Sequence, residues 1–230
     1  GVPFRRPLAH MEEAVTIIRR LLGGEEVTLH GKVFNTDRAT LSGTPGEVAP
    51  QQQVPIYLAA LGPRMLKIAG ALADGVLLSW TPASYLKQAV QLIHDAVIGA
   101  GRDPSVVAIS GYVRVGVTDD PVAGKESLRQ QMAQYVGTPF YRSFFRNTGF
   151  GQEMDGVESA MAQAESGAEA RVNAISPLMQ EEVGIIGNAE ECRAALEELR
   201  ALGLEKPVVV PLPLGDIKES YRRTLTALAP

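Results

Sequence analysis

Residues 54–80 limit the possible folds of this chain more than any other stretch. An apolar run of strand length, 54–60, is broken by Leu61-Gly62-Pro63 and followed by a helical pattern that ends at Asp74-Gly75. A second apolar run, 76–80, completes the stretch. The order strand, turn, helix, strand is typical of a βαβ unit in a parallel sheet. Both runs are continuous rather than alternating, which predicts strands covered on both faces.

The turn between the first strand and the helix is the best candidate for a binding function. Leu61 and Gly62 follow the carboxyl end of a strand and precede a helix, where backbone N–H groups lack partners and the helix dipole is positive. Pro63 suits the first helical position, because its missing N–H costs nothing there. We therefore expect the turn to bind a phosphate group. Such a turn occurs in parallel α/β proteins in general, so its residues leave a purely structural role open.

The same stretch carries a family resemblance. Residues 55–63, PIYLAALGP, and 69–76, AGALADGV, resemble the luciferase-like monooxygenase superfamily, and within it the deazaflavin-dependent branch typified by methylenetetrahydromethanopterin reductase. Outside 54–80 the resemblance lies in the order of elements. It implies a (β/α)8 barrel whose turn after this strand contacts the cofactor phosphate. The chain resembles the C-terminal two-thirds of a member, starting after the family's fourth strand.

The remaining pattern predicts helices and strands in alternation. Four core strands, each followed by a helix, are expected to be parallel and adjacent in the order 54–60, 76–80, 106–118 and 207–212. The other expected elements are a helix starting near Leu8, a hairpin of 27–29 and 32–34, helices at 82–99 and 121–136, a helix from the capping-box residue Asn188 to Leu202, and a final helix at 216–228.

The predicted domain organisation is a single luciferase-like barrel domain over residues 1–230. Within it, residues 138–184 are expected to form an irregular, mobile lid. Four strands are half of what a (β/α)8 barrel needs, and an open four-stranded sheet is possible at this length. The resemblance favours a barrel that lacks its N-terminal strands. The chain by itself is therefore expected to be inactive, whereas the full-length parent is expected to be an enzyme.

Composition excludes several functional classes. A net charge of −4 offers no basic surface for a nucleic acid, and no apolar run approaches the ~20 residues of a membrane span. The single cysteine, Cys192, permits no internal disulfide, so a cytoplasmic location is expected. His10, His30 and His94 lack ligand spacing, and no metal site is predicted. Phosphate-loop, dinucleotide and serine-nucleophile motifs are absent as well.

Two sets of residues are the candidate site. The resemblance assigns cofactor contacts around the turn and at the end of the second strand: Ala60, Leu61, Gly62, Pro63, Arg64 and Trp80. Trp80 is as readily explained as a core aromatic, and Arg64 as a solvated helix residue. A substrate pocket is expected from Tyr141, Arg142 and Phe145, with Arg142 or Arg146 facing an acidic cofactor tail or an anionic substrate. No convincing catalytic acid or base is found.

The resemblance implies a redox enzyme that transfers hydride between the reduced deazaflavin coenzyme F-420 (F420) and an organic acceptor, a small molecule. An FMN-dependent monooxygenase of the same superfamily is the close alternative. A third possibility is a truncated relative that binds a phosphorylated ligand or a partner chain without catalysis. A homodimer is expected.

Overall fold

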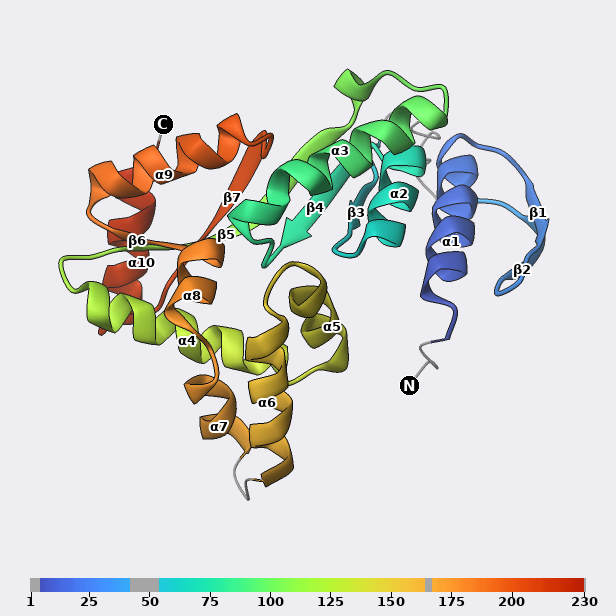
Figure 1. Ribbon diagram of the computed structural model, residues 1–230. Coiled ribbons are helices and arrows are strands. Elements are labelled where there is room, and N and C mark those ends of the chain that lie inside the picture. The colour runs from blue at the N-terminus through green and yellow to red at the C-terminus, as the bar shows by residue number, and fades with distance from the viewer. Residues whose placement is uncertain (1–4, 42–53, 164–166, 230) are drawn as a thin grey trace. The chain divides into compact units, whose positions relative to one another are not determined.

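The computed structural model describes residues 5–41, 54–163 and 167–229, whose contacts divide the chain into two compact units. One unit is formed by residues 1–77 and 89–109, and the other by residues 78–88 and 110–230. Strands and α-helices alternate over residues 57–136 and again over 177–228, while the described residues from 121 to 183 form successive helices without a strand between them (Figure 1). No described helix is long and apolar enough to cross a membrane.

The first unit contains the βαβ stretch. Its elements are α1 (Pro7–Leu22), the antiparallel pair β1 (Val27–His30) and β2 (Asn35–Ala39), β3 (Tyr57–Ala59), α2 (Pro63–Leu72), most of β4 (Gly75–Ser79), the C-terminal part of α3 (Ala83–Gly99) and the short 3-10 helix Pro104–Val106. Strands β3 and β4 pair in parallel, with Leu58 opposite Val76. The predicted βαβ unit is therefore confirmed.

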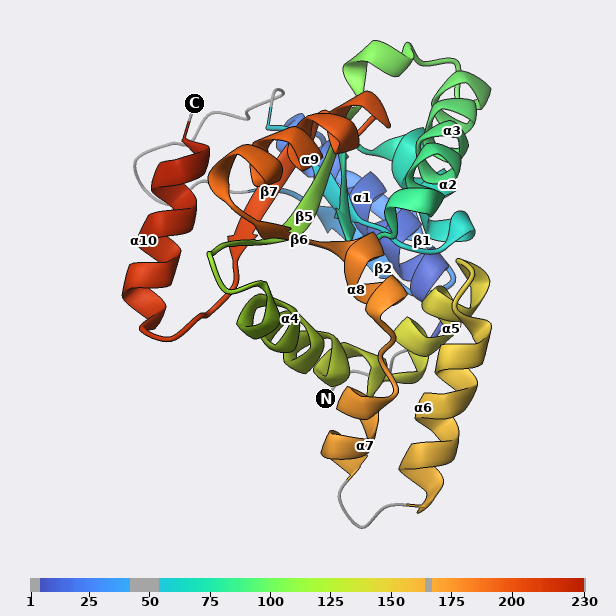
Figure 2. The ribbon, with the colours of Figure 1, turned by 60° about the vertical axis from the view of Figure 1, so that its left-hand side comes forward.

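The second unit holds the other strands. Its elements are β5 (Ala108–Val117), α4 (Pro121–Val136), α5 (Pro139–Asn147), α6 (Gly151–Gln163), α7 (Gly167–Asn173), α8 (Pro177–Val183), β6 (Gly184–Gly187), α9 (Ala189–Ala201), β7 (Lys206–Pro211) and α10 (Ile217–Leu228). Helices α9 and α10 contact each other and β7, while α4 to α7 gather into a helical cluster (Figure 2).

Strand β5 is the centre of the second unit. Its residue Arg114 lies opposite Gly184 of β6 and opposite Val210 of β7, and both pairings are parallel. The predicted parallel strands are thus confirmed, and the fold is α/β with a mainly parallel sheet. Strand β6 was not predicted from the sequence, because four residues between two helices carry too short a pattern. The described residues hold five parallel-paired strands rather than four.

The predicted first hairpin has the wrong second strand. Residues 32–34 were expected to pair, but β2 begins at Asn35. The carboxylate of Glu13 on α1 accepts the backbone N–H groups of Lys32, Val33 and Phe34 at 2.7–3.0 Å. These donors are therefore not available for a strand ladder, and the three residues form a bend around the carboxylate. A local sequence pattern does not predict a hydrogen bond to a side chain 19 residues away.

The prediction that the first strand is covered on both faces is also wrong for the described residues. In β3 the buried Leu58 lies between Tyr57 and Ala59, both exposed, and Tyr57 keeps 42% of its surface accessible. On β5, Tyr112 keeps 41%, and its partner Val208 on β7 keeps 40%. One face of β3 is therefore packed and the other carries exposed apolar surface, whereas β5, beyond its first residue, is buried on both faces except at Tyr112.

The described part of residues 138–184 is mostly helical rather than irregular. It contains α5, α6, α7 and α8, and the core of this segment is aromatic, with Phe145 fully buried against Phe144 and Phe150. The Glu, Met, Ala and Gln residues of α6 favour a helix. A lid function for this segment stays a prediction.

Asp74 joins the elements of the first unit. Its carboxylate accepts the Ile56 N–H at 2.8 Å, pairs with Arg19 at 2.8 Å and lies 3.9 Å from Arg102. Burial alone would raise the pKa of Asp74, but the Ile56 bond and the two arginines outweigh it and hold the pKa below its usual value. Asp74 is thus a structural residue, remote in sequence from the turn at Gly62.

Candidate functional site

The turn before α2 has the geometry expected of an anion site. Gly62 is the N-cap of α2 in extended conformation, and its carbonyl accepts the N–H groups of Met65 and Leu66 at 3.0 Å. Pro63 occupies the first turn, as predicted. Among the described residues, the backbone N–H of Leu61 has no acceptor. A Cβ added at Gly62 meets nothing within 4 Å, so there is open space directly over the turn.

The side chains around this turn divide into two groups. Ala60 and Leu61 are buried at 3% and 8% exposure, and the Ala60 N–H donates to the Leu77 carbonyl at 3.2 Å. Both residues therefore anchor the turn through their side chains and leave backbone groups to face a ligand. Pro63 and Arg64 are exposed, and the structure gives Arg64 no partner among the described residues. The Arg64 guanidinium is free to neutralise an anion at the helix N-terminus.

A second candidate centre lies in the other unit, around Trp80. Trp80 follows the last residue of β4 and adopts the left-handed conformation, with φ at 54°. Such a backbone is strained for a bulky side chain and persists only where the surroundings enforce it. Its ring is 1% exposed and packs 5.0 Å from the Tyr135 ring. The indole N–H has no hydrogen-bond partner among the described residues.

Arg114 completes this second centre. Its guanidinium carbon lies 3.9 Å from the centre of the Trp80 ring, and one terminal nitrogen donates to Ser79 Oγ at 3.1 Å. The residue is 5% exposed, and burial lowers the pKa of Arg114 even though nearby tyrosines act in the opposite direction. Nε has no partner, and no ion pair reaches Arg114 from a carboxylate in the described parts of the chain. A buried cation without a counter-charge is costly unless an anion joins it.

Tyr141 belongs to the same aromatic cluster. Its ring lies 5.0 Å from that of Tyr135 in an edge-on arrangement. Burial raises the pKa of Tyr141, with the phenol of Tyr135 contributing, while a hydrogen bond with Ser79 and the charge of Arg114 oppose the shift. The phenol therefore stays protonated at neutral pH. We define Ser79, Trp80, Arg114, Tyr135 and Tyr141 as the Arg114 cluster.

The other two residues predicted for the substrate pocket are held elsewhere. Phe145 is fully buried in the helical cluster and has no surface to offer a ligand. Arg142 donates to the carbonyls of Val136 and Gly137 at 2.9 Å and pairs with Glu158 at 3.1 Å, so it caps the end of α4. Both residues are thus held by contacts within the helical cluster, and their role in a substrate pocket stays a prediction.

Arg146, the second arginine predicted to face an acidic cofactor tail or an anionic substrate, has carboxylate partners of its own, and that role stays a prediction. Arg146 forms ion pairs with Asp155 and Glu158. Its charge is satisfied within the helical cluster, whereas that of Arg114 is not. Sequence reasoning missed Arg114, although a signal existed: an arginine stands alone in the middle of the apolar strand 106–118. A charge in such a position needs a partner or a ligand.

Comparisons with known proteins agree with this architecture. Residues 1–206 match the family model described as luciferase-like monooxygenase. The chain belongs to the luciferase-like monooxygenase family.

The individual relatives point to one branch of the family. The chain is 29% identical to 5,10-methylenetetrahydromethanopterin reductase from Methanolobus tindarius over 220 residues, which are 95% of this chain and 65% of the relative. It is 35% identical to F420-dependent glucose-6-phosphate dehydrogenase from Nakamurella multipartita, over 41% of the chain and 27% of that relative. The chain therefore spans about two-thirds of the length of the reductase that it matches.

The solved structures that the chain resembles include F420-dependent enzymes. The coenzyme F420 dependent tetrahydromethanopterin reductase from Methanopyrus kandleri superposes with a TM-score of 0.74 at 25% identity, covering 96% of this chain and 62% of that one. An F420-dependent secondary alcohol dehydrogenase shares the fold, with a TM-score of 0.65 at 20% identity over 95% of this chain and 61% of that one.

Proposed function

We propose that this chain is part of an oxidoreductase that transfers hydride between reduced F420 and a small organic acceptor. The observation that carries the proposal is the similarity to F420-dependent reductases over 95% of the chain. Because the chain spans 65% of the length of the first of these relatives, the activity of the whole protein is part of the proposal. A cytoplasmic homodimer remains a prediction from the sequence.

The turn before α2 fits the phosphate of such a cofactor. It combines an unpaired Leu61 N–H, open space over Gly62 and the free charge of Arg64 at a helix N-terminus. These groups attract an anion without reaching any reacting atom. Their role is to bind and orient the cofactor, so that the geometry needed for hydride transfer is reached when it is bound. Cofactor contacts of Ala60, Leu61, Gly62, Pro63 and Arg64 are part of this proposal.

The Arg114 cluster fits a second anionic or oxygen-bearing group. Two N–H donors, Arg114 Nε and Trp80 Nε1, are buried there without partners. A ligand oxygen that accepts from them would remove the cost of two unsatisfied donors and neutralise the cation. The cluster excludes water by its aromatic rings, which strengthens the charge interaction. Trp80, Arg114 and Tyr141 are accordingly proposed to contact the cofactor or the substrate.

The chemistry comes from the cofactor, because a reduced deazaflavin supplies the hydride when bound. The residues of the two centres bind, orient and exclude water. The described carboxylates near them do not offer a catalytic acid or base: Asp74 is committed to Arg19 and to the Ile56 N–H.

The test is to follow oxidation of reduced F420 by absorbance, without oxygen, for the 230-residue chain and for a version extended upstream. The proposal predicts acceptor-dependent oxidation by the extended version, and no more than trace activity for the chain alone. Oxygen consumption with reduced FMN, together with no oxidation of reduced F420, would favour the monooxygenase alternative. Binding of F420 without turnover in either version would favour a non-catalytic relative.

A further inference from the structure

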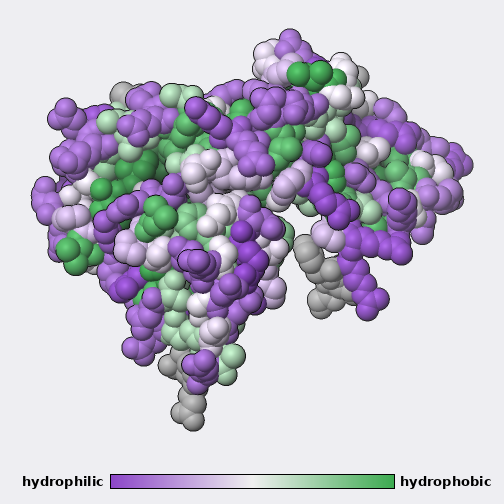
Figure 3. Space-filling model, viewed as in Figure 1, coloured by the Kyte–Doolittle hydropathy of each residue, from purple (hydrophilic) through white to green (hydrophobic). Residues whose placement is uncertain are grey.

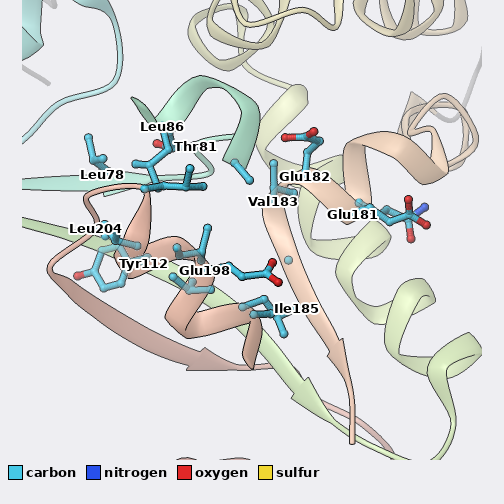
Figure 4. A pocket seen from close by; sticks show the side chains of 18 of the residues that line it. Leu78, Thr81, Leu86, Tyr112, Glu181, Glu182, Val183, Ile185, Glu198 and Leu204 are labelled. Carbon is cyan, nitrogen blue, oxygen red and sulfur yellow. The ribbon is translucent and has the colours of Figure 1, made fainter. Parts of the chain in front are cut away.

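A cavity of about 480 Å³ lies in the second unit, next to the point where β4 ends and β6 begins. It is lined by residues of α3, α8, β6 and α9, among them Leu86, Val183, Ile185 and Glu198 (Figure 4). In Figure 3, hydrophobic surface appears between α9 and α4, where β6 lies. A cavity of this size holds a small organic molecule.

The cavity is not the Arg114 cluster. Of that cluster only Ser79 lines it, while Trp80, Arg114, Tyr135 and Tyr141 do not. Side chains alternate along β5, so Gly111 and Val113 face the opposite way from Arg114. Tyr112, which also lines the cavity, shares the face of Arg114, and its ring centre lies 5.9 Å from the guanidinium carbon. A Cβ at Gly111 would lie 2.9 Å from a methyl of Leu204, another residue of the cavity wall.

Two side-chain oxygen atoms of the cavity wall are buried without a hydrogen-bond partner among the described residues. Gln180 on α8 is 7% exposed, and its amide oxygen Oε1 accepts no bond, while its Nε2 donates to the Ser176 carbonyl at 3.5 Å. The hydroxyl of Thr81 is likewise buried and unpartnered. Two such groups on separate elements at one cavity are unusual, because buried polar atoms are normally satisfied. An amide oxygen can only accept, so its missing partner is a donor.

The charge of the wall has the sign that a donor ligand requires. Four glutamates line the cavity with a single lysine: Glu181, Glu182, Glu191, Glu198 and Lys125. Lys125 pairs with Glu181 at 3.1 Å, Glu182 accepts the Ser84 N–H, and Glu191 accepts the Asn188 N–H. The carboxylate of Glu198 has no partner among the described residues. The wall is therefore acidic, and at least one carboxylate is available to a ligand.

From these observations we propose that the cavity is a binding site for an organic cation, an ammonium group attached to an apolar body. The leucine, isoleucine and valine side chains of the wall cover the apolar body. The ammonium group donates hydrogen bonds to Gln180 Oε1 and Thr81 Oγ1 and is attracted by Glu198. This site is separate from the proposed cofactor and substrate contacts and does not depend on them.

The experiment compares three probes of equal chain length by isothermal titration calorimetry with the 230-residue chain: hexylammonium, hexanol and hexanoate. Hexylammonium is expected to bind saturably at one site, with an affinity at least about tenfold above that of hexanol. Hexanoate is expected not to bind. Equal affinity for all three probes, or no saturable binding of hexylammonium, overturns the proposal; the second result is the one expected of a cavity that holds only water.

Two variants locate the site. Gln180→Leu and Glu198→Gln are each expected to weaken hexylammonium binding about five- to tenfold. Glu197→Gln is the matched control on the same helix, because Glu197 pairs with Arg200 and does not line the cavity. Unchanged affinity in Glu198→Gln, or an equal loss in Glu197→Gln, contradicts the proposal. Because Glu198 is exposed, its variant keeps the test decisive if Gln180→Leu does not fold.

Discussion

Gly62 offers a direct test of the anion site at the turn before α2. Its backbone is extended, with φ at −79°, and a Cβ there meets nothing within 4 Å. Asparagine and aspartate are both favoured N-cap residues, so Gly62→Asn and Gly62→Asp should leave the helix as stable or slightly more stable, by a few tenths of a kcal/mol. The two variants have nearly the same shape and differ in one negative charge.

That charge acts on a bound phosphate. At a separation of about 5 Å the repulsion is ~0.8 kcal/mol at the dielectric constant of water and ~3.3 kcal/mol at an effective value of 20. The dissociation constant of F420 should therefore be about fourfold to about 250-fold higher for Gly62→Asp than for Gly62→Asn. The ratio should shrink as salt is added, since exposed charges are screened.

The assay is a titration followed by F420 fluorescence, with thermal unfolding of each variant as the control for folding. Equal dissociation constants for the two variants would refute a phosphate at this turn. A fall in the melting temperature of both variants would mean that the space over Gly62 is not open.

Three further predictions follow from the two centres and from Asp74. Asp74→Ala should lower the free energy of unfolding by about 1–3 kcal/mol relative to the surface control Glu219→Ala. The pKa of Asp74 is lowered in the folded state, so its contribution to stability is complete above the ordinary carboxyl pKa of about 3.9. Acid-unfolding curves should show this contribution disappear as the pH falls from there through the lowered pKa. Arg114→Met should weaken F420 or substrate binding about 10- to 100-fold and alter the stability of the free chain by less than ~1.5 kcal/mol, and an unchanged affinity in the titration would contradict the role of the guanidinium. Trp80 is the one tryptophan of the sequence, so its fluorescence emission should change when a ligand reaches the Arg114 cluster. The emission should not change when hexylammonium binds. Identical emission spectra with and without F420 would place the cofactor elsewhere.

Local signals in the sequence predicted the local structure well. The capping box of Asn188 and Glu191 forms as predicted, and helices begin at Pro63 and Pro121 as the proline positions indicate. These features depend on bonds within one turn of chain, which a pattern of neighbouring residues encodes.

Features that depend on distant parts of the chain were not predictable in this way. The three N–H groups captured by Glu13 displaced a strand, and β6 exists because β5 offers it an edge opposite Arg114. The partners of the candidate site residues were not predictable either. The sequence alone shows no partner for the arginines of 138–184, yet Arg142 donates to backbone carbonyls and pairs with Glu158. Which arginine lacks a counter-charge is a property of the packed structure.

The central claim, that this chain serves a deazaflavin enzyme, is tested most directly by competition for cofactor binding. Equilibrium dialysis of the chain against an equimolar mixture of F420 and FMN measures the two bound fractions by absorbance in one experiment. The account predicts that F420 is retained in excess over FMN and that Gly62→Asp reduces this retention more than Gly62→Asn does. Preferential retention of FMN, or retention of neither compound, would contradict it.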